Sequence, residues 1–270
     1  MRLRSIIATC AALLLTACAS SPPTFQAMAP SNAGVSGYTL GRSPLLDHND
    51  HTIRHLDKEN TVLYKQTSGG GGVGLGLLLG PIGIAANVSM IESRTKEDVA
   101  LLQGKLNLDP RGWFSEAVGK NGITLGDGAA ATRATPYFLI AKMEDERLVV
   151  SSAVIVEQQH GAAYWRGTYT YQIPQTYTVA ELANLDAAGL RTLHASGALG
   201  FDALIKHIAQ EKPEGFDKEP RILFRSRMLF VVDADMPGAL VADEGDVVWV
   251  RSFTGVHGLR KANMKYTLKK

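Results

Sequence analysis

Cysteine is nearly absent from this chain. Only Cys10 and Cys18 occur among its 270 residues, so residues 19–270 contain no thiol for a disulfide bond, a cysteine-ligated zinc site or a cysteine nucleophile. An excess of charge of one sign is also missing. Once Arg2 and Arg4 are set aside, 26 basic residues stand against 26 acidic ones. Because phosphate binding needs a basic field, we expect no nucleic acid as a partner.

The short motifs that usually reveal catalysis or cofactor binding are missing as well. The chain has no G-x-S-x-G, no G-x-x-x-x-G-K-[ST] and no H-E-x-x-H. The letters of Ser93–Lys96 fit S-x-x-K, but the motifs that accompany it in penicillin-recognising enzymes are absent. We therefore assign no catalytic residue and expect no cofactor, which favours a non-enzymatic role without deciding it.

The first eighteen residues carry the clearest signal. Residues 1–4 include two arginines, and residues 6–17 form an apolar run that is too short to cross a bilayer. The run ends in Leu15-Thr16-Ala17-Cys18, which resembles the lipobox of bacterial lipoproteins. The resemblance implies that residues 1–17 are a signal peptide. It also implies that cleavage leaves Cys18 with a diacylglyceryl thioether and a further acyl chain, such as palmitate, on its amine.

The resemblance to lipoproteins also predicts a location. Two or more acyl chains hold a protein stably on a membrane, so the lipid on Cys18 is expected to suffice as the anchor. Residue 19 is alanine rather than aspartate, which implies sorting to the outer membrane in enterobacterial-type systems. Whether the protein faces the periplasm or the cell surface stays open.

Composition divides the remainder into three parts. Residues 18–37 are rich in serine, proline, alanine and glycine, and this predicts a flexible lipidated tether. Residues 38–215 alternate strand and helix patterns and are expected to form an α+β domain. Residues 216–270 return to strand patterns and predict a C-terminal β-rich lobe.

Three histidines lie close together in a polar stretch, at His48, His51 and His55. In a helix, His51 and His55 would share one face, and imidazole suits Zn²⁺ and Cu²⁺. A solvated histidine-rich loop explains the same residues. It is the favoured interpretation, because no glutamate stands at the position that the zinc motif H-E-x-x-H requires. We therefore expect no metal here, while leaving metal binding open.

Residues 69–91 contain no charged residue. A phosphate-binding loop is one interpretation, because Gly69, Gly71 and Gly74 fit G-x-G-x-x-G. Four consecutive glycines satisfy that pattern by chance, and no lysine is placed to contact phosphate. Nucleotide binding is therefore the weakest of the alternatives for this segment.

Two further interpretations of the segment 69–91 compete. Its length approaches that of a bilayer-spanning helix, and Gly76 and Gly80 form a small-xxx-small pair that allows close helix packing. Contact with the membrane or self-association would follow. Pro81 interrupts such a helix, which favours the other interpretation, a hydrophobic loop and short helix packed in the domain core.

Local patterns predict most of the secondary structure. Helices are expected over Glu92–Leu106 and Pro110–Lys120, in a segment that begins at the capping box Thr178–Glu181, and over Phe201–Gln210 after an interruption at Gly197 and Gly200. Three strand runs with short connections are expected at Thr135–Met143, Arg147–Glu157 and Ala163–Ile173. These elements predict an α+β fold of mostly antiparallel sheets, with a three-strand meander and helices packed on one face.

The order of these elements over residues 60–210 is loosely similar to the TolB N-terminal and curli-channel family of lipoproteins, although no motif supports the likeness. The likeness implies an α/β sandwich in an envelope assembly. We expect an outer-membrane lipoprotein with a structural or interaction role in the cell envelope. Its partner would be an envelope protein or a second copy. The alternatives are an envelope hydrolase, whose site would gather His160, His194 or His207 with an acid, and a pore-like assembly component that uses residues 69–91.

Overall fold

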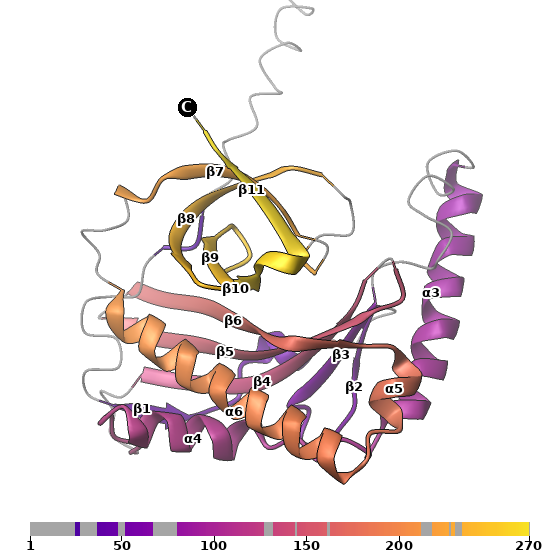
Figure 1. The fold of residues 1–270 in the computed structure, drawn as a ribbon, viewed down its shortest axis with the longest axis horizontal. Coiled ribbons are helices and arrows are strands. Elements are labelled where there is room, and N and C mark those ends of the chain that lie inside the picture. The colour runs from indigo at the N-terminus through magenta and orange to yellow at the C-terminus, as the bar shows by residue number, and fades with distance from the viewer. Residues whose placement is uncertain are drawn as a thin grey trace, which may run out of the picture.

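One large sheet organises the protein (Figure 1). The computed structural model describes residues 25–27, 37–47, 52–66, 80–126, 132–143, 145–160, 163–211, 218–226, 228–229 and 234–269. Within them, eleven strands form the sheet: β1 (Tyr38–Leu40), β2 (Ile53–His55), β3 (Val62–Gln66), β4 (Thr132–Lys142), β5 (Leu148–His160), β6 (Ala163–Tyr177), β7 (Arg221–Ser226), β8 (Met236–Glu244), β9 (Val247–Arg251), β10 (Val256–Arg260) and β11 (Met264–Leu268).

The strands follow the order β11-β7-β8-β9-β10-β6-β5-β4-β3-β2. Three neighbouring pairs among these described strands are parallel: β1 with β4, β3 with β4, and β6 with β10. Strands β1 and β3 lie one after the other along the same edge of β4, because β1 pairs with residues 132–134 and β3 with residues 138–142. The pairing of β6 with β10 joins the N-terminal half of the sheet to the C-terminal half.

This sheet shows that the expected fold class was wrong. Strands β4, β5 and β6 occupy the ranges in which three strands were expected, but they do not form a separate meander. They are the middle of a mixed eleven-stranded sheet, with the parallel neighbours β3 and β10 on either side. Short turns predict the pairing of consecutive strands only, so they could not reveal these long-range parallel pairs.

The expectation that helices cover one face of antiparallel sheets is corrected too. One face of β4–β6 packs on helices α4 (Pro110–Lys120) and α6 (Ala187–Gln210), while strands β7–β11 curl over the other face (Figure 1). Ala141 and Val149 of the central strands share a buried cluster with Phe224 and Val250 of the curled half. The sheet therefore covers part of itself and needs no second helical layer there.

Helix α6 runs without a break through the two glycines at which an interruption was expected. A Cβ added at Gly197 would lie 2.7 Å from the Phe138 ring, and one added at Gly200 would lie 2.4 Å from Ser152 Oγ. These glycines let α6 approach the sheet closely. From the sequence alone, the same glycines indicate a break in the helix. Short helix α5 (Val179–Ala183) precedes α6 and carries the expected capping box between Thr178 and Glu181.

Helix α3 (Gly80–Leu102) begins earlier than the helix expected from residue 92. Tyr64 and Lys142 of the sheet hold its second half, because both reach Asp98 Oδ2, at 2.5 and 2.8 Å. Its first half continues away from the sheet (Figure 1). Among the described residues, no helix combines the length and apolar character needed to cross a membrane. The division of the chain at residue 215 stays a prediction.

Two short 3-10 helices complete the described secondary structure. They are η1 (Pro44–Asp47) and η3 (Lys261–Asn263). Leu46 of η1 packs in a small buried cluster with Leu63, Tyr137 and Ile155.

Candidate functional site: the docking site of residues 25–27

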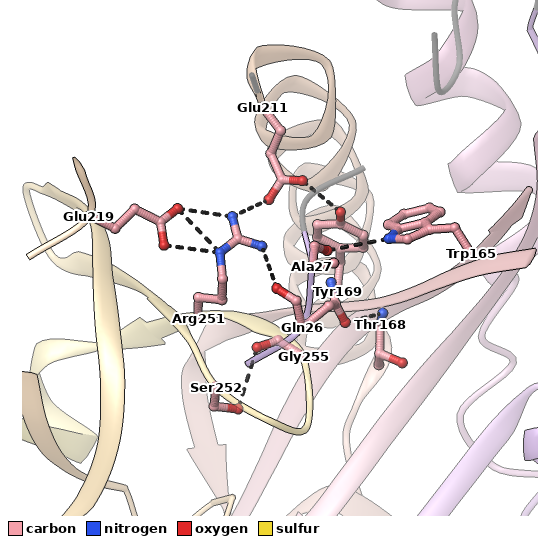
Figure 2. A network of polar contacts seen from close by, with 10 residues as sticks. All are labelled: Gln26, Ala27, Trp165, Thr168, Tyr169, Glu211, Glu219, Arg251, Ser252 and Gly255. Carbon is pink, nitrogen blue, oxygen red and sulfur yellow. Dashed lines mark hydrogen bonds and ion pairs between the residues drawn. The ribbon is translucent and has the colours of Figure 1, made fainter. Parts of the chain in front are cut away.

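Residues 25–27 lie against the folded body and follow Leu15–Cys18 closely in the sequence. The backbone N–H of Gln26 donates to the carbonyl of Ser252 at 2.9 Å, and Oε1 of its side chain accepts from the Thr168 N–H at 2.7 Å. Trp165 Nε1 donates to the Ala27 carbonyl at 3.3 Å (Figure 2). The segment therefore bridges β6 and the turn after β9, which lie far apart in the sequence.

Arg251 holds the centre of this docking site (Figure 2). Its guanidinium contacts Glu211 Oε1 at 2.7 Å and Glu219 Oε2 at 3.0 Å, and it donates to the Gln26 carbonyl at 3.4 Å. Glu211 also accepts from the hydroxyl of Tyr169 at 2.8 Å. One arginine thus ties the end of α6, the segment before β7 and residues 25–27 to the end of β9.

The charges of this cluster are removed from solvent. The side chain of Arg251 is 0% exposed, and those of Glu211 and Glu219 are 2% and 7% exposed. Burial alone would lower the pKa of Arg251, but hydrogen bonds and charges from Glu219 and Glu211 raise it above its usual value. Arg251 therefore stays charged, and the cluster depends on all three groups together because a buried charge without its partner is costly.

Local structure places each of these groups. Glu211 is the C-cap residue of α6, where the helix dipole disfavours a carboxylate, and Arg251 compensates for that position. Gly255, in the turn between β9 and β10, has a φ of +147°. A Cβ there would lie 2.5 Å from the Thr168 carbonyl oxygen. Only glycine allows this turn to pack on β6 beside residue 26.

A buried histidine contacts Ser252, the residue whose carbonyl accepts from Gln26. His257 Nδ1 is 2.8 Å from Thr170 Oγ1, and its Nε2 is 3.2 Å from Ser252 Oγ and 3.0 Å from Thr254 Oγ1. Burial, with a smaller effect of the Lys65 charge, lowers the pKa of His257 to about 3. Its ring is therefore neutral, and threonine stands where a serine hydrolase would hold an acid. The arrangement fixes the β9–β10 turn.

A second histidine borders a cavity near the docking site. His207 stacks on Trp249 with ring centroids 3.8 Å apart, and its buried Nε2 has no hydrogen-bond partner among the residues that the structure describes. Burial lowers its pKa to about 4. The adjacent cavity, of about 340 Å³, is also lined by Glu211 and Glu219. Both acids already bind Arg251, so neither is available to orient the imidazole.

The structure brings few of the expected site residues together. Cys18, His48 and His51 lie outside the described residues, and so do residues 69–79. His55 lies in strand β2, so the helical spacing considered for it does not apply. In the described part of the chain, no three metal-binding side chains form a group. Metal binding by the three histidines and lipidation of Cys18 remain predictions.

Two other histidines had been named for a possible hydrolase. His194 Nε2 contacts the Leu106 carbonyl at 2.9 Å, and its ring lies 5.2 Å from that of Trp113, which is a packing role. The side chain of His160 lies outside what the structure describes.

Sequence reasoning missed the docking site, although one signal was present. Arg251 directly follows the apolar residues 247–250 of the same strand. An isolated charge at the end of an apolar strand predicts a buried ion pair. Its partners could not be identified from the sequence, because Glu211 and Glu219 precede Arg251 by 40 and 32 residues. Nothing in residues 25–27 distinguished them from the rest of the expected tether.

Comparisons with known proteins identify no relative. No family model, no curated protein and no solved structure matches this chain.

Proposed function

We propose that this chain is an outer-membrane lipoprotein, anchored through Cys18, whose folded body has a structural or interaction role in the bacterial cell envelope. The lipobox-like Leu15–Cys18 supports the anchor. The main observation in support is that the folded body binds residues 25–27, which follow Leu15–Cys18 closely in the sequence. Arg251, Thr168 and Ser252 make these contacts. The body thereby holds the polypeptide next to its own anchor.

Docking shortens the distance between the body and the membrane. Phe25 lies seven positions after Cys18 in the sequence, and an extended chain of that length reaches at most about 25 Å. If the body began only at Tyr38, twenty residues would reach about 70 Å. A short connection suits a protein whose partners are at the membrane surface, such as an envelope protein or a second copy, rather than one that must reach across the periplasm.

The test compares the wild type with Cys18→Ser and with Cys10→Ser as a matched control. Mass spectrometry of the N-terminal peptide should show an acylated Cys18 in the wild type and in Cys10→Ser, because residue 10 leaves with the signal peptide. Both should fractionate with the outer membrane, and Cys18→Ser should not. An unmodified Cys18, or membrane fractionation that does not depend on it, would contradict the proposal.

An envelope hydrolase is the second candidate, and the orphaned Nε2 of His207 beside a cavity favours it. The described lining of that cavity contains no serine, threonine or cysteine, and a pKa of about 4 makes His207 a weak base. A panel of chromogenic esters, glycosides and phosphate esters, assayed with the wild type and His207→Gln, tests this candidate. If the wild type hydrolysed one of these substrates and His207→Gln did not, the hydrolase would become the better supported function.

A further inference from the structure

We propose that Arg133 and Arg166, which the buried carboxylate of Glu157 holds on either side of itself, bind a phosphate group. We call these three residues the arginine row. The proposal concerns a site that the envelope role does not use, and it does not depend on a lipid anchor at Cys18. Either proposal can therefore fail without the other.

The pairing of three neighbouring strands places the arginine row. Arg133 of β4 lies opposite Glu157 of β5, and Glu157 lies opposite Arg166 of β6. Directly opposed residues of paired strands share a face of the sheet, so the two arginines flank the glutamate with about 10 Å between their Cα atoms. Ala134 and Val156 are the adjacent residues in their strands and pack in the cluster that includes α4 and α6. The arginine row is therefore on the face away from these helices.

Glu157 is the buried centre of the arginine row. Its side chain is 1% exposed, whereas those of Arg133 and Arg166 are 46% and 35% exposed. Glu157 Oε1 accepts from Arg166 Nε at 2.8 Å, from the Tyr164 hydroxyl at 2.5 Å and from Ser43 Oγ at 3.2 Å. Its Oε2 accepts from Arg133 Nε at 2.8 Å. Burial alone would raise the pKa of Glu157, but hydrogen bonds from Tyr164, Arg166 and Arg133 lower it below its usual value, so the carboxylate stays ionised.

The positive charge of the arginine row exceeds what the buried carboxylate can neutralise. Two guanidiniums share one carboxylate, so one positive charge is left over. Among the described residues, Glu157 and Tyr164 supply the oxygens that both guanidiniums contact. Each guanidinium has five N–H groups and a carboxylate has about four acceptor positions, so further N–H groups remain for another acceptor. Without Arg133, Glu157 would still be paired with Arg166, so the ion pair alone does not require both arginines.

The chemistry of the remaining N–H groups favours phosphate. Guanidinium binds oxyanions through a planar fork, and phosphate and carboxylate are the groups that match this fork. A phosphate group has oxygens in more than one plane, so it can contact two guanidiniums on either side of Glu157, whereas a carboxylate fills one fork. Tyr164 restricts the motion of Arg166, because its hydroxyl accepts from Arg166 at 3.2 Å and its ring centroid lies 5.3 Å from Arg166 Cζ. Donors that are fixed before binding lose less entropy when a ligand arrives.

A third arginine adds positive charge beside the arginine row. Arg111 of α4 donates to the carbonyl of Gly41 at 3.4 Å. A Cβ at Gly41 would lie 2.4 Å from the side chain of Arg133, so the chain at Gly41 lies against both arginines. Asp109, the nearest acid to Arg111 in the sequence, is engaged as the N-cap of α4. An anionic group that approaches Arg133 therefore meets a positive field.

Isothermal titration calorimetry with inorganic phosphate tests the proposal on the full-length mature protein in a phosphate-free detergent. The ionic strength is held constant, so that screening does not change along the titration. We expect saturable binding that weakens about ten-fold or more in Arg133→Met and in Arg166→Met, because each variant loses a charge-assisted contact. Arg133→Lys should weaken it as well, since lysine keeps the charge but lacks the planar fork. Absence of saturable binding in the wild type would overturn the proposal.

Arg191→Met is the matched control, because it removes the same charge at a distance from the arginine row. Arg191 is an exposed residue near the start of α6, on the other face of the sheet, and Glu211 at the end of this helix is the residue that contacts β6 through Tyr169. We expect the affinity of Arg191→Met for phosphate to stay within about two-fold of the wild type. Equal weakening in Arg191→Met and Arg133→Met would show a general positive field and overturn the proposal. Equal affinity of the wild type for acetate would also overturn it, because the site would then not select phosphate.

The phosphate group could belong to a soluble molecule or to a lipid headgroup, and vesicle flotation separates the two sources. Cys18→Ser, which lacks the proposed acylation site, is mixed with phosphatidylcholine vesicles that contain phosphatidic acid. Flotation that is lost when Arg133→Met is added to Cys18→Ser assigns the site to a headgroup phosphate. Phosphate binding by calorimetry without flotation assigns it to a soluble phosphate ester.

Urea midpoints of each variant show whether it keeps the fold. Glu157 retains one arginine in either methionine variant, so both variants should fold. If Arg166→Met is unstable, Arg133→Met and Arg133→Lys still test the site, because Arg133 is the more exposed of the two arginines.

Discussion

Removing the guanidinium of Arg251 should destabilise the protein more than removing any exposed charge. In Arg251→Met, the buried carboxylates of Glu211 and Glu219 lose the guanidinium that both contact. Breaking a buried pair in this way costs roughly 3–5 kcal/mol of unfolding free energy. For a chain of this size, that loss lowers the melting temperature by about 6–20 °C. Urea unfolding, with the midpoint and m-value determined separately, measures it.

Arg133→Met provides the matched control. Arg133 Nε also binds a buried glutamate, Glu157, at 2.8 Å, but Arg166 Nε binds the same carboxylate at 2.8 Å. Glu157 therefore keeps a cationic partner when Arg133 is removed. The side chain of Arg133 is 46% exposed, so we expect a loss of less than about 1 kcal/mol. The contrast between the two variants isolates the effect of leaving buried charge unpaired.

Neutralising the acids should restore much of the stability. The triple variant Arg251→Met, Glu211→Gln, Glu219→Gln removes both uncompensated charges, so it should be more stable than Arg251→Met alone. Arg251→Met should also make the chain easier to cleave before residue 25 in limited proteolysis, because the Gln26 carbonyl loses its donor. The reasoning about this cluster is refuted if Arg251→Met loses no more unfolding free energy than Arg133→Met. It is also refuted if the triple variant is no more stable than Arg251→Met.

Three further predictions concern other parts of the fold. Burial holds the pKa of His257 at about 3 in the fold, below its unfolded value near 6.5, so its contribution to stability is complete above pH 6.5 and is lost as the pH falls toward 3. Urea unfolding should show a loss of roughly 2 kcal/mol at pH 5 from this group, and His257→Gln should flatten that dependence. An unchanged pH profile would show that other groups dominate. Gly200→Ala places a Cβ within 2.4 Å of a side-chain oxygen and should cost about 1–3 kcal/mol in thermal unfolding. Gly119→Ala, where a Cβ meets nothing within 4 Å, should instead stabilise helix α4 by about 0.5–1 kcal/mol. Asp98→Asn weakens the ion pair that Lys142 makes at 2.8 Å and should cost about 2 kcal/mol. Hydrogen exchange should then rise first in the second half of α3, and uniform exchange would contradict this assignment.

Elements with strong local signals could be predicted from the sequence. Helix α4 was expected at its observed bounds, Pro110–Lys120, and in the structure Asp109 caps its start while Phe114 and Val118 lie on its buried face. The hairpin of β8 and β9 also has a local signal in the turn Asp243–Asp246, and in the structure Glu244 pairs with Val247. Each of these elements depends on neighbouring residues, so a pattern over a few positions was sufficient.

The features that were missed depend on distant residues. Strand β10 was not expected, since Val256–Arg260 is short and includes a glycine. Gly258 belongs there because a Cβ would lie 3.0 Å from the Tyr171 ring of the paired strand β6. In the same way, the role of Gly197 depends on Phe138, which is 59 positions earlier in the chain. Single-sequence patterns contain no information about which far segment lies against a residue.

The candidate site shows the same limit more strongly. Composition alone assigned residues 25–27 to a tether, because no local feature marks Gln26 as a binding residue. Its three partners are Thr168 of β6, Arg251 at the end of β9 and Ser252 in the turn after β9. Leu15–Cys18 could be compared with a lipobox because such a motif is short and contiguous, and lipidation there stays a prediction. The docking site, in contrast, exists only once the sheet is assembled.

The parallel pairing of β6 with β10 has a consequence for the order of folding. Thr170 and His257 meet across this pair although 87 residues separate them, and Gln26 meets Arg251 across 225 residues. Contacts so distant form slowly, because closing long loops costs entropy before any contact compensates for it. The N-terminus is synthesised first, so residues 25–27 must wait for almost the entire chain before their binding site exists. Docking of residues 25–27 therefore marks completed folding, and a chain that stalls before Arg251 would lack the site that binds this segment.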